Sequence, residues 1–340
     1  MGPKFKWSAG VGSFLVGSVA LASIPSLAAE PAAAADPTAE IFAHMSAAKV
    51  AAGQDWPGIA TNLCLPDEPH LVRSSVARPQ GARSTWYASP YKVFDNLYWL
   101  GTRQHSAWAL QTSEGIILID SNFEWAFEDE LINGMKTLGL DPASIRYVLL
   151  GHAHGDHDQW GATLQKRYGT KVVMGEDDWR LTLSRPEDFP GGIPQKDISV
   201  PENGAMKITL GDATVTAVST PGHTGGTLSF IFQVKENGQP LTVAYPGGTG
   251  TGVFRNDFAR WDQYIQSQER FSEMAREAGA TALLSNHSEF DGTYTKARLL
   301  NVKREEGEGN PFVVGEDAVQ RYFKVMLECA KASKLRYMLK

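Results

Sequence analysis

The stretch His152-Ala153-His154-Gly155-Asp156-His157 places three imidazoles and one carboxylate within six residues. It directly follows the apolar run 147–150, which predicts a buried strand. A loop at the end of a buried strand is a rigid base for functional side chains. The first two histidines are two residues apart and point to the same side of an extended segment. The adjacent Asp156 and His157 can then serve a second centre. Imidazole and carboxylate donors suit Zn²⁺, with manganese or iron as alternatives.

Two further histidines lie where predicted strands end. His223 lies in the turn 220–227 between two predicted strands, and His287 follows the short predicted strand 281–285. Each alone would be an ordinary loop histidine. Beside the first motif they complete two sets of three donors, one of three histidines and one of an aspartate with two histidines. His105, in another loop between predicted strands, is a candidate to line the cleft.

The order of the predicted elements defines the fold class. Strands are predicted at 98–100, 106–112, 115–120, 147–150, 171–174, 206–210, 213–218, 227–234, 241–245 and 281–285, and helices at 124–138, 159–168, 258–278 and 315–332. In this order a run of strands is followed by a strand–helix–strand unit, and the same pattern then occurs a second time. Two such halves, each a sheet with helices on its outer face, predict an α/β fold with mixed sheets, a four-layer αββα sandwich.

Residues 1–28 have the layout of a secretory signal peptide. Lys4 and Lys6 precede an apolar stretch, and Ser26-Leu27-Ala28 offers a cleavage site. An uncleaved membrane anchor is the alternative, but glycines and Pro25 interrupt a run that is short for a hydrocarbon core of about 30 Å. Cleavage predicts a periplasmic or secreted protein without a membrane attachment.

Behind the signal, residues 29–85 are expected to form a partly disordered N-terminal extension, with a poorly ordered Ala/Pro-rich leader at 29–40. Residues 86–340 then form the catalytic domain. Its helical extension begins at about residue 291 and packs on the N-terminal extension or mediates oligomerisation.

Charge and cysteine content limit the classes of partner and site. The chain has 340 residues, and 32 basic against 38 acidic side chains give a net charge of −6. This balance argues against nucleic acid and anionic membranes as partners and leaves a small-molecule substrate; the oligomeric state is open. Cys64 and Cys329 are too few for a cysteine-rich zinc module. In an oxidising compartment they either form a disulfide or remain two buried thiols.

The motif His-x-His-x-Asp-His, the sequence Thr-Pro-Gly-His-Thr at 220–224 and a late histidine together resemble the metallo-β-lactamase superfamily over about residues 90–290. A ligand set without cysteine is most similar to the subclass B3 metallo-β-lactamases. The resemblance implies two zinc ions per chain, the first held by His152, His154 and His223 and the second by Asp156, His157 and His287. It also implies that Asp120 supports the metal loop from behind; otherwise Asp120 is a residue of a strand-end turn.

One segment departs from the pattern of this family. After the predicted strand 241–245 many members carry a bridging Asp, and subclass B3 enzymes carry Asp-Ser-x-Ser, but this chain reads Tyr245-Pro246-Gly247-Gly248-Thr249. Only Thr249 keeps a hydroxyl for a substrate carboxylate. The change weakens phosphodiesterase, glyoxalase and lactonase interpretations, which expect the Asp. The glycine-rich run 247–252 either offers backbone N–H groups to a ligand or forms a flexible surface turn.

Together these patterns predict a zinc-dependent hydrolase of an amide or ester carbonyl, above all of a β-lactam ring. The expected nucleophile is a hydroxide shared by two Zn²⁺ ions, which Asp156 orients before passing on a proton. Thr249 and His105 are expected to contact the substrate. The alternatives are an exported hydrolase of lactones, esters or acyl-amides with little β-lactamase activity, and a zinc-binding carrier without activity. Residues 179–200 are expected to be a mobile flap with aromatic side chains for a substrate ring, or a solvent-exposed connection.

Overall fold

The computed structural model describes residues 1, 2, 4, 36–64, 82–252, 254–302 and 308–340. Its contacts divide the chain into Met1–Ala35 and Asp36–Lys340, and the fold concerns the second unit. Apart from residues 1, 2 and 4, the predicted signal peptide lies outside the described residues, as do residues 29–35 of the leader. Within the described ranges, no helix combines the length and the apolar character that crossing a membrane requires.

The first sheet contains seven strands that lie side by side in chain order. They are β1 (Tyr91–Phe94), β2 (Leu97–Gly101), β3 (Ser106–Thr112), β4 (Gly115–Ile119), β5 (Ile145–Leu149), β6 (Lys171–Gly175) and β7 (Ile198–Val200). The pairs from β1 to β4 are antiparallel and those from β4 to β7 are parallel. Parallel strands end at the same edge of a sheet, so the loops after β4, β5 and β6 gather there.

The second sheet contains five strands in the order β12-β11-β10-β9-β8. Their bounds are β8 (Ala205–Leu210), β9 (Ala213–Ser219), β10 (Leu228–Glu236), β11 (Gln239–Tyr245) and β12 (Ala280–Leu283). Only the pair of β11 and β12 is parallel. The mixed sheets agree with the predicted α/β class.

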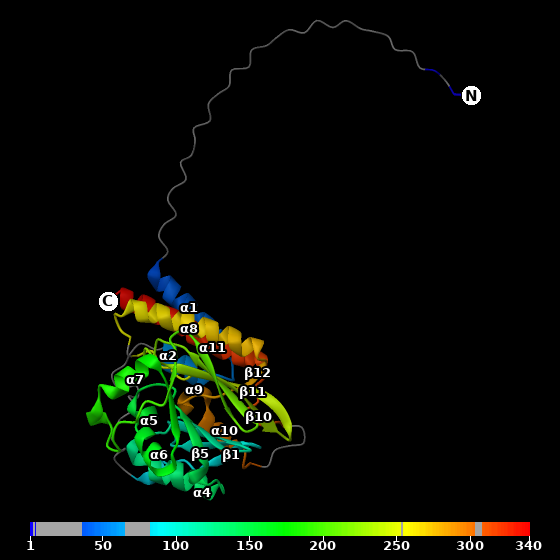
Figure 1. Ribbon diagram of the computed structural model, residues 1–340. Coiled ribbons are helices and arrows are strands. Elements are labelled where there is room, and N and C mark those ends of the chain that lie inside the picture. Colours follow the sequence, from blue (N-terminus) through cyan, green and yellow to red (C-terminus); the bar gives the residue numbers. More distant parts are fainter. Residues whose placement is uncertain (3, 5–35, 65–81, 253, 303–307) are drawn as a thin grey trace. The chain divides into compact units, whose positions relative to one another are not determined.

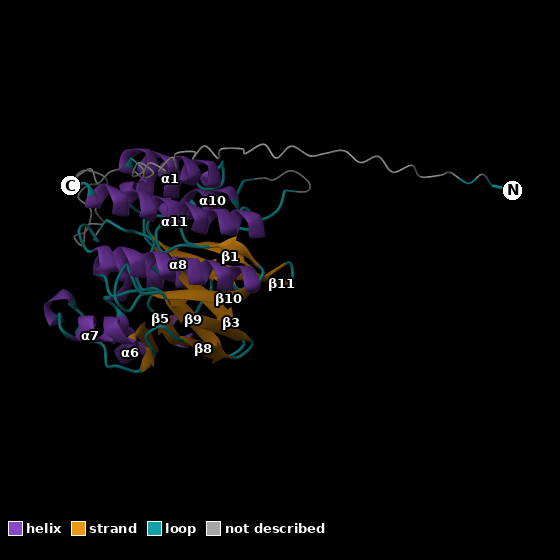
Figure 2. Ribbon diagram, turned by 90° about the horizontal axis from the view of Figure 1, so that it is seen from above, coloured by secondary structure: helices purple, strands orange, loops and turns teal. Residues whose placement is uncertain are grey.

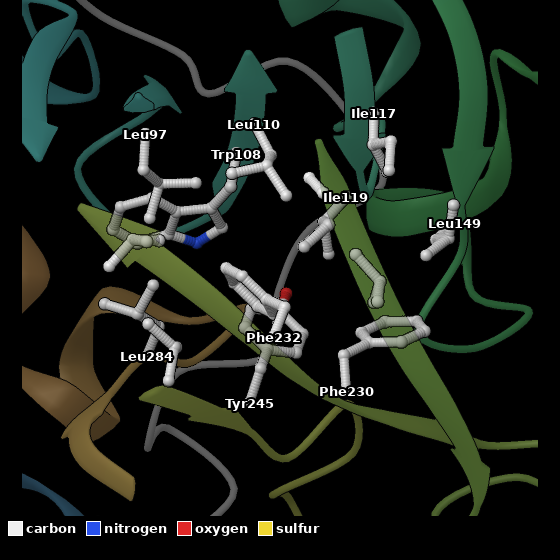
Figure 3. Close-up of a cluster of buried hydrophobic side chains, with 14 of the residues drawn as sticks. Leu97, Trp108, Leu110, Ile117, Ile119, Leu149, Phe230, Phe232, Tyr245 and Leu284 are labelled. Carbon is white, nitrogen blue, oxygen red and sulfur yellow. The ribbon is translucent and has the colours of Figure 1, made fainter. Parts of the chain in front are cut away.

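A hydrophobic core fills the space between the two sheets (Figure 3). Trp108 of β3 and Ile119 of β4 face Phe230 of β10 and Tyr245 of β11, and all four are fully buried. Burying such a side chain contributes about 1.5–3 kcal/mol, so this layer holds the two halves together.

Helices cover the outer faces of both sheets (Figures 1 and 2). Their bounds are α1 (Pro37–Ala52), α2 (Pro57–Cys64), α3 (Glu124–Ala126), α4 (Asn133–Thr137), α5 (Gly155–Asp158), α6 (Gly161–Tyr168), α7 (Glu176–Leu183), α8 (Phe258–Glu277), α9 (Ser288–Asp291), α10 (Thr293–Leu299) and α11 (Glu316–Met338). A π-helical segment, Phe127–Ile132, joins α3 to α4 and packs with α6 on the first sheet. The helices α8 and α11 pack on the second sheet. The four-layer αββα sandwich is confirmed.

The N-terminal helices belong to the layer over the second sheet. The helix α1 lies along α11, and α2 is joined to α11 by the disulfide Cys64–Cys329, with 4.6 Å between the two Cα atoms. The C-terminal helix therefore packs on the N-terminal extension. The expectation of poor order fails for residues 37–40, which form the first turn of α1.

The predicted flap has a different structure. Residues 176–183 form α7, a 3₁₀ turn follows at Pro186–Asp188, and residues 198–200 pair with the first sheet as β7. Trp179 is fully buried, and its indole N–H donates to the carbonyl of Ile198 at 2.8 Å. Phe189 is also buried. These aromatic side chains are core residues, so the expectation that they stack on a substrate is wrong.

Candidate metal centre

Asp156, His157 and His287 bring three donor atoms together at the edge where β5 and β12 end. Asp156 Oδ2 lies 3.1 Å from His157 Nε2 and 3.3 Å from His287 Nε2, and the two nitrogens are 3.3 Å apart. Donors at zinc-ligand distances from one tetrahedral ion are about 3.3 Å from each other. The spacing therefore fits a single metal ion. Asp156 and His157 lie in α5, and His287 directly precedes α9.

His152, His154 and His223 form the neighbouring group, with one donor atom of each within 4.8 Å of the others. His154 Nδ1 lies 3.1 Å from His223 Nε2. The first two residues follow β5, and His223 lies in the turn between β9 and β10. His152 also belongs to a group with Asp156 and His157, so the two sets of donors adjoin. The structure thus brings all six predicted ligands together.

Three of these histidines, His152, His223 and His157, are oriented through the ring nitrogen Nδ1. The Nδ1–H of His152 donates to the carbonyl of Gly247 at 2.7 Å, and that of His223 to the carbonyl of Gly250 at 2.5 Å. The Nδ1–H of His157 donates to Asp120 Oδ2 at 3.1 Å. Each bond leaves Nε2 free to bind a metal, an arrangement typical of metal-binding histidines.

Asp120 lies behind the metal loop, where the resemblance places it. Its Oδ1 accepts the backbone N–H of Gly151 at 2.7 Å, and its Oδ2 accepts the hydroxyl of Tyr245 at 2.7 Å as well as His157. Asp120 has a φ of +58°, a strained value for a residue other than glycine. The three hydrogen bonds hold it there. The hydroxyl of Tyr245 links the second sheet to this carboxylate, a role that the sequence did not predict.

The glycine-rich run after β11 contributes carbonyl groups to the centre. Besides His152, the Gly247 carbonyl accepts the side-chain amide of Asn286 at 2.9 Å. Residues 246–249 are buried. A Cβ on Gly247 would overlap the carbonyl of Leu228, and one on Gly248 would lie 2.6 Å from the Cβ of His223. Because these residues are buried, the expectation of a flexible surface turn is wrong for residues 247–249, whereas the cradle of N–H groups stays a prediction.

Thr249 is buried, with 1% of its surface exposed. Its hydroxyl has no hydrogen-bond partner among the residues that the structure describes. The expected substrate contact at Thr249 stays a prediction. His105 remains near the centre, with Nε2 3.7 Å from Asp156 Oδ2.

Asp178 and Arg185, whose roles the sequence did not predict, hold the first metal loop by hydrogen bonds. Asp178 of α7 accepts the backbone N–H of Ala153 at 2.8 Å, the hydroxyl of Thr224 at 2.7 Å and the N–H of Gly226 at 3.0 Å. Arg185 donates to the carbonyl of Ala153 at 3.0 Å. The backbone N–H and the carbonyl of Ala153, the residue between His152 and His154, are thus both held by hydrogen bonds. No local pattern signals these contacts.

Burial keeps the imidazoles of the first group neutral. It lowers the pKa of His152 and His223 well below the usual range and that of His154 to about 4. Neutral imidazole is the form that binds a metal. This group is therefore ready to accept a cation at neutral pH.

Without a metal ion, the histidines of the second group are protonated and pair with the neighbouring carboxylates. Burial lowers the pKa of His157, but the carboxylates of Asp156 and Asp120 outweigh it and raise the pKa to about 10. Burial also lowers the pKa of His287, and hydrogen bonds to Asp156 and Glu289 outweigh it and raise the pKa to about 9. A metal ion would take the place of these protons.

Comparison with known proteins identifies the domain that carries this centre. Residues 100–236 match the family model of the metallo-beta-lactamase superfamily. This segment is a metallo-beta-lactamase superfamily domain. The chain is similar to BJP-1, a subclass B3 metallo-beta-lactamase of Bradyrhizobium japonicum, with 27% identity, a TM-score of 0.58, and coverage of 69% of this chain and 90% of that one. The FEZ-1 metallo-beta-lactamase of Legionella gormanii shares the fold at 22% identity and a TM-score of 0.59, over 75% and 96% of the two chains.

Curated relatives of the metallo-beta-lactamase domain are hydrolases of other kinds. The N-acyl homoserine lactonase AttM of Agrobacterium fabrum is 35% identical over 123 residues, which are 33% of this chain and 44% of the lactonase. A hydroxyacylglutathione hydrolase of Rhodopseudomonas palustris is 25% identical over 198 residues, 56% of this chain and 72% of that protein. The match thus spans less than half the length of the lactonase. These relatives are hydrolases of different substrates, so the activity and the substrate of this chain need a separate argument.

Proposed function

We propose that this chain is a zinc-dependent hydrolase that opens a β-lactam ring. The observation that carries this proposal is the donor set, five imidazoles and Asp156 in two adjoining groups. The segment after β11 adds no carboxylate to these groups, and it packs beneath them through Gly247. This set resembles subclass B3 and departs from hydrolases that carry a bridging Asp in that segment. The disulfide supports a further proposal, that the chain is exported to the periplasm or secreted.

The residues of the centre have separable roles in this reaction. When bound, zinc would lower the pKa of water to about 7 and polarise the substrate carbonyl. His152, His154 and His223 would hold the first ion, and Asp156, His157 and His287 the second. The carboxylate of Asp156 would also orient the attacking water and carry its proton to the leaving nitrogen or oxygen. Asp120 keeps the His157 ring in the required orientation.

A lactone or acyl ester is the second candidate substrate. Two observations favour it: the similarity to AttM, and the absence of the serines that hold the β-lactam carboxylate in the subclass B3 pattern. Thr249, which keeps a hydroxyl in that segment, is buried. Both candidates use the same attack on a strained or activated carbonyl.

A substrate panel with the purified, zinc-loaded protein distinguishes the two candidates. We expect turnover of nitrocefin or imipenem with kcat/KM above about 10⁴ M⁻¹s⁻¹, the low end for enzymes on their proper substrates. Values far below this, together with faster cleavage of acyl-homoserine lactones or aryl esters, would establish the second candidate. The variants H154A and H287A should each lose activity and bind less zinc. Hydrolysis that persists in both variants and after dipicolinate treatment contradicts a metal mechanism.

A further inference from the structure

His105 is held beside the second metal group by backbone pairing. Residues His105 and His287 form an isolated β-bridge, and the flanking bonds run from Ser106 N to the Asn286 carbonyl at 2.9 Å and from Ser288 N to the Gln104 carbonyl at 2.8 Å. The two imidazole rings are 5.0 Å apart between centroids. A metal ligand and His105 are therefore fixed to each other by the same short ladder.

The hydrogen bonds of Thr102 define which nitrogen of His105 carries the proton. The Thr102 hydroxyl oxygen accepts the backbone N–H groups of Gln104 at 3.2 Å and of His105 at 2.9 Å. These bonds occupy both of its lone pairs, so its own hydrogen is left to donate. The acceptor is His105 Nδ1 at 3.2 Å. An imidazole that accepts at Nδ1 carries its proton on Nε2.

This Nε2–H is a buried donor without a partner among the residues that the structure describes. The ring of Phe123 packs against His105 edge to face, with 4.7 Å between centroids, and His105 is 4% exposed. The carboxylate oxygen Asp156 Oδ2 lies 3.7 Å from Nε2, longer than a hydrogen bond. A buried donor without a partner is costly, and a small displacement of the carboxylate closes this gap.

We propose that His105 is a positioning residue of the second metal group, whose Nε2–H donates to the Asp156 carboxylate when that carboxylate binds a metal ion. The proposal rests on the metal centre of the proposed function and extends it to a residue outside the six ligands. Because Nε2 carries the proton, His105 is a donor to the ligand Asp156 and is not a seventh ligand. Its bond opposes rotation of the carboxylate away from His157 and His287.

Metal titration of the whole protein tests this role without any substrate. Wild type, H105L and H105Q are freed of metal and titrated with Zn²⁺, and then with Co²⁺ to follow the visible spectrum. Since loss of a partner that hydrogen-bonds to a metal ligand costs about 10–100-fold in affinity, H105L should weaken binding of the second ion by that factor and leave the first unchanged. Glutamine keeps a side-chain N–H, so H105Q should retain most of the affinity.

Two results would overturn the proposal. In the first, H105L binds both ions as wild type does. In the second, H105Q weakens binding as much as H105L, and the Co²⁺ spectra of both variants show the loss of a nitrogen donor; this result would identify His105 as a ligand. Long-range ¹H–¹⁵N NMR of the metal-free wild type is independent of any folding defect in the variants. It should show His105 protonated at Nε2, and a proton on Nδ1 contradicts the proposal. A wild type that binds two ions with these properties but hydrolyses nothing in the panel refutes only the proposed function.

Discussion

Gly247 lies beside the candidate metal centre at a position with no space for a side chain. Its carbonyl orients His152, and a Cβ there would overlap the carbonyl of Leu228. We expect Gly247→Ala to lower the free energy of unfolding by about 1–3 kcal/mol, the usual cost of overpacking, and to weaken metal binding because the carbonyl must move. Urea denaturation and Zn²⁺ titration measure the two effects.

Gly309 provides the matched control for this substitution. A Cβ at this position meets nothing within 4 Å. Gly309→Ala should therefore leave both stability and metal affinity close to those of wild type. If Gly247→Ala behaves in the same way, the glycine is not needed for packing under the metals.

At the residue scale, the sequence predicted which side chains gather at the candidate metal centre but not which side chains orient them. His152, His154 and Asp156 were predictable because they are crowded into one motif beside a buried strand. Tyr245 was not, because its contact with Asp120 joins residues 125 positions apart.

At the scale of elements, α7 fixes the first metal loop through the hydrogen bonds of Asp178. Asp178 joins Ala153 on one loop to Thr224 and Gly226 on the other, so it fixes the two loops that carry the first three histidines relative to each other. An asparagine has the same shape but presents an N–H₂ group to a backbone or hydroxyl donor. We expect Asp178→Asn to cost about 1–3 kcal/mol of stability through an unsatisfied buried donor.

The same substitution should weaken the first metal ion more than the second, because the contacts of Asp178 lie on the first group's loops. Stepwise Zn²⁺ titration and thermal unfolding measure these effects. The control is Asp262→Asn. Asp262 lies on α8 and forms an exposed ion pair with Lys334 of α11, so this substitution should change neither metal affinity nor thermal stability. Equal weakening of both ions would show that Asp178 supports the domain in general.

Elements with strong periodicity were predicted closely, and those that pack through small residues were missed. The predicted strand 106–112 has the bounds of β3, and the predicted helix 258–278 differs from α8 by one residue. The helix α1 was missed because the face that it buries contains Ala48, Ala51 and Ala52. Such a face carries no hydrophobic periodicity. Its burial depends on the presence of α11.

For the whole molecule, the disulfide Cys64–Cys329 closes a loop with a sequence separation of 265 residues. Removing a native disulfide costs about 2–5 kcal/mol of stability. We expect the double variant C64S/C329S to unfold at a temperature several degrees lower than wild type, and wild type in dithiothreitol to match it. Dithiothreitol should not affect the variant itself. Unchanged melting of reduced wild type contradicts a stabilising role.

The four-layer architecture followed from the order of the elements, whereas this bridge did not. The sequence left a disulfide and two buried thiols equally open, since pairing depends on the distance between α2 and α11. That distance results from packing on the second sheet. The disulfide that links the N-terminal helix α2 to the C-terminal helix α11 is therefore known only from the structure.

The position of the two cysteines also sets an order of events during biosynthesis. At ribosomal rates, Cys329 is made on the order of 10–50 s after Cys64. In that interval the proposed ligands from His152 to His287 have all been synthesised, while the thiol of Cys64 does not yet have its disulfide partner. The residues of the candidate metal centre are thus present before the disulfide closes, and the disulfide can fix α2 only after nearly all of the sandwich has been made.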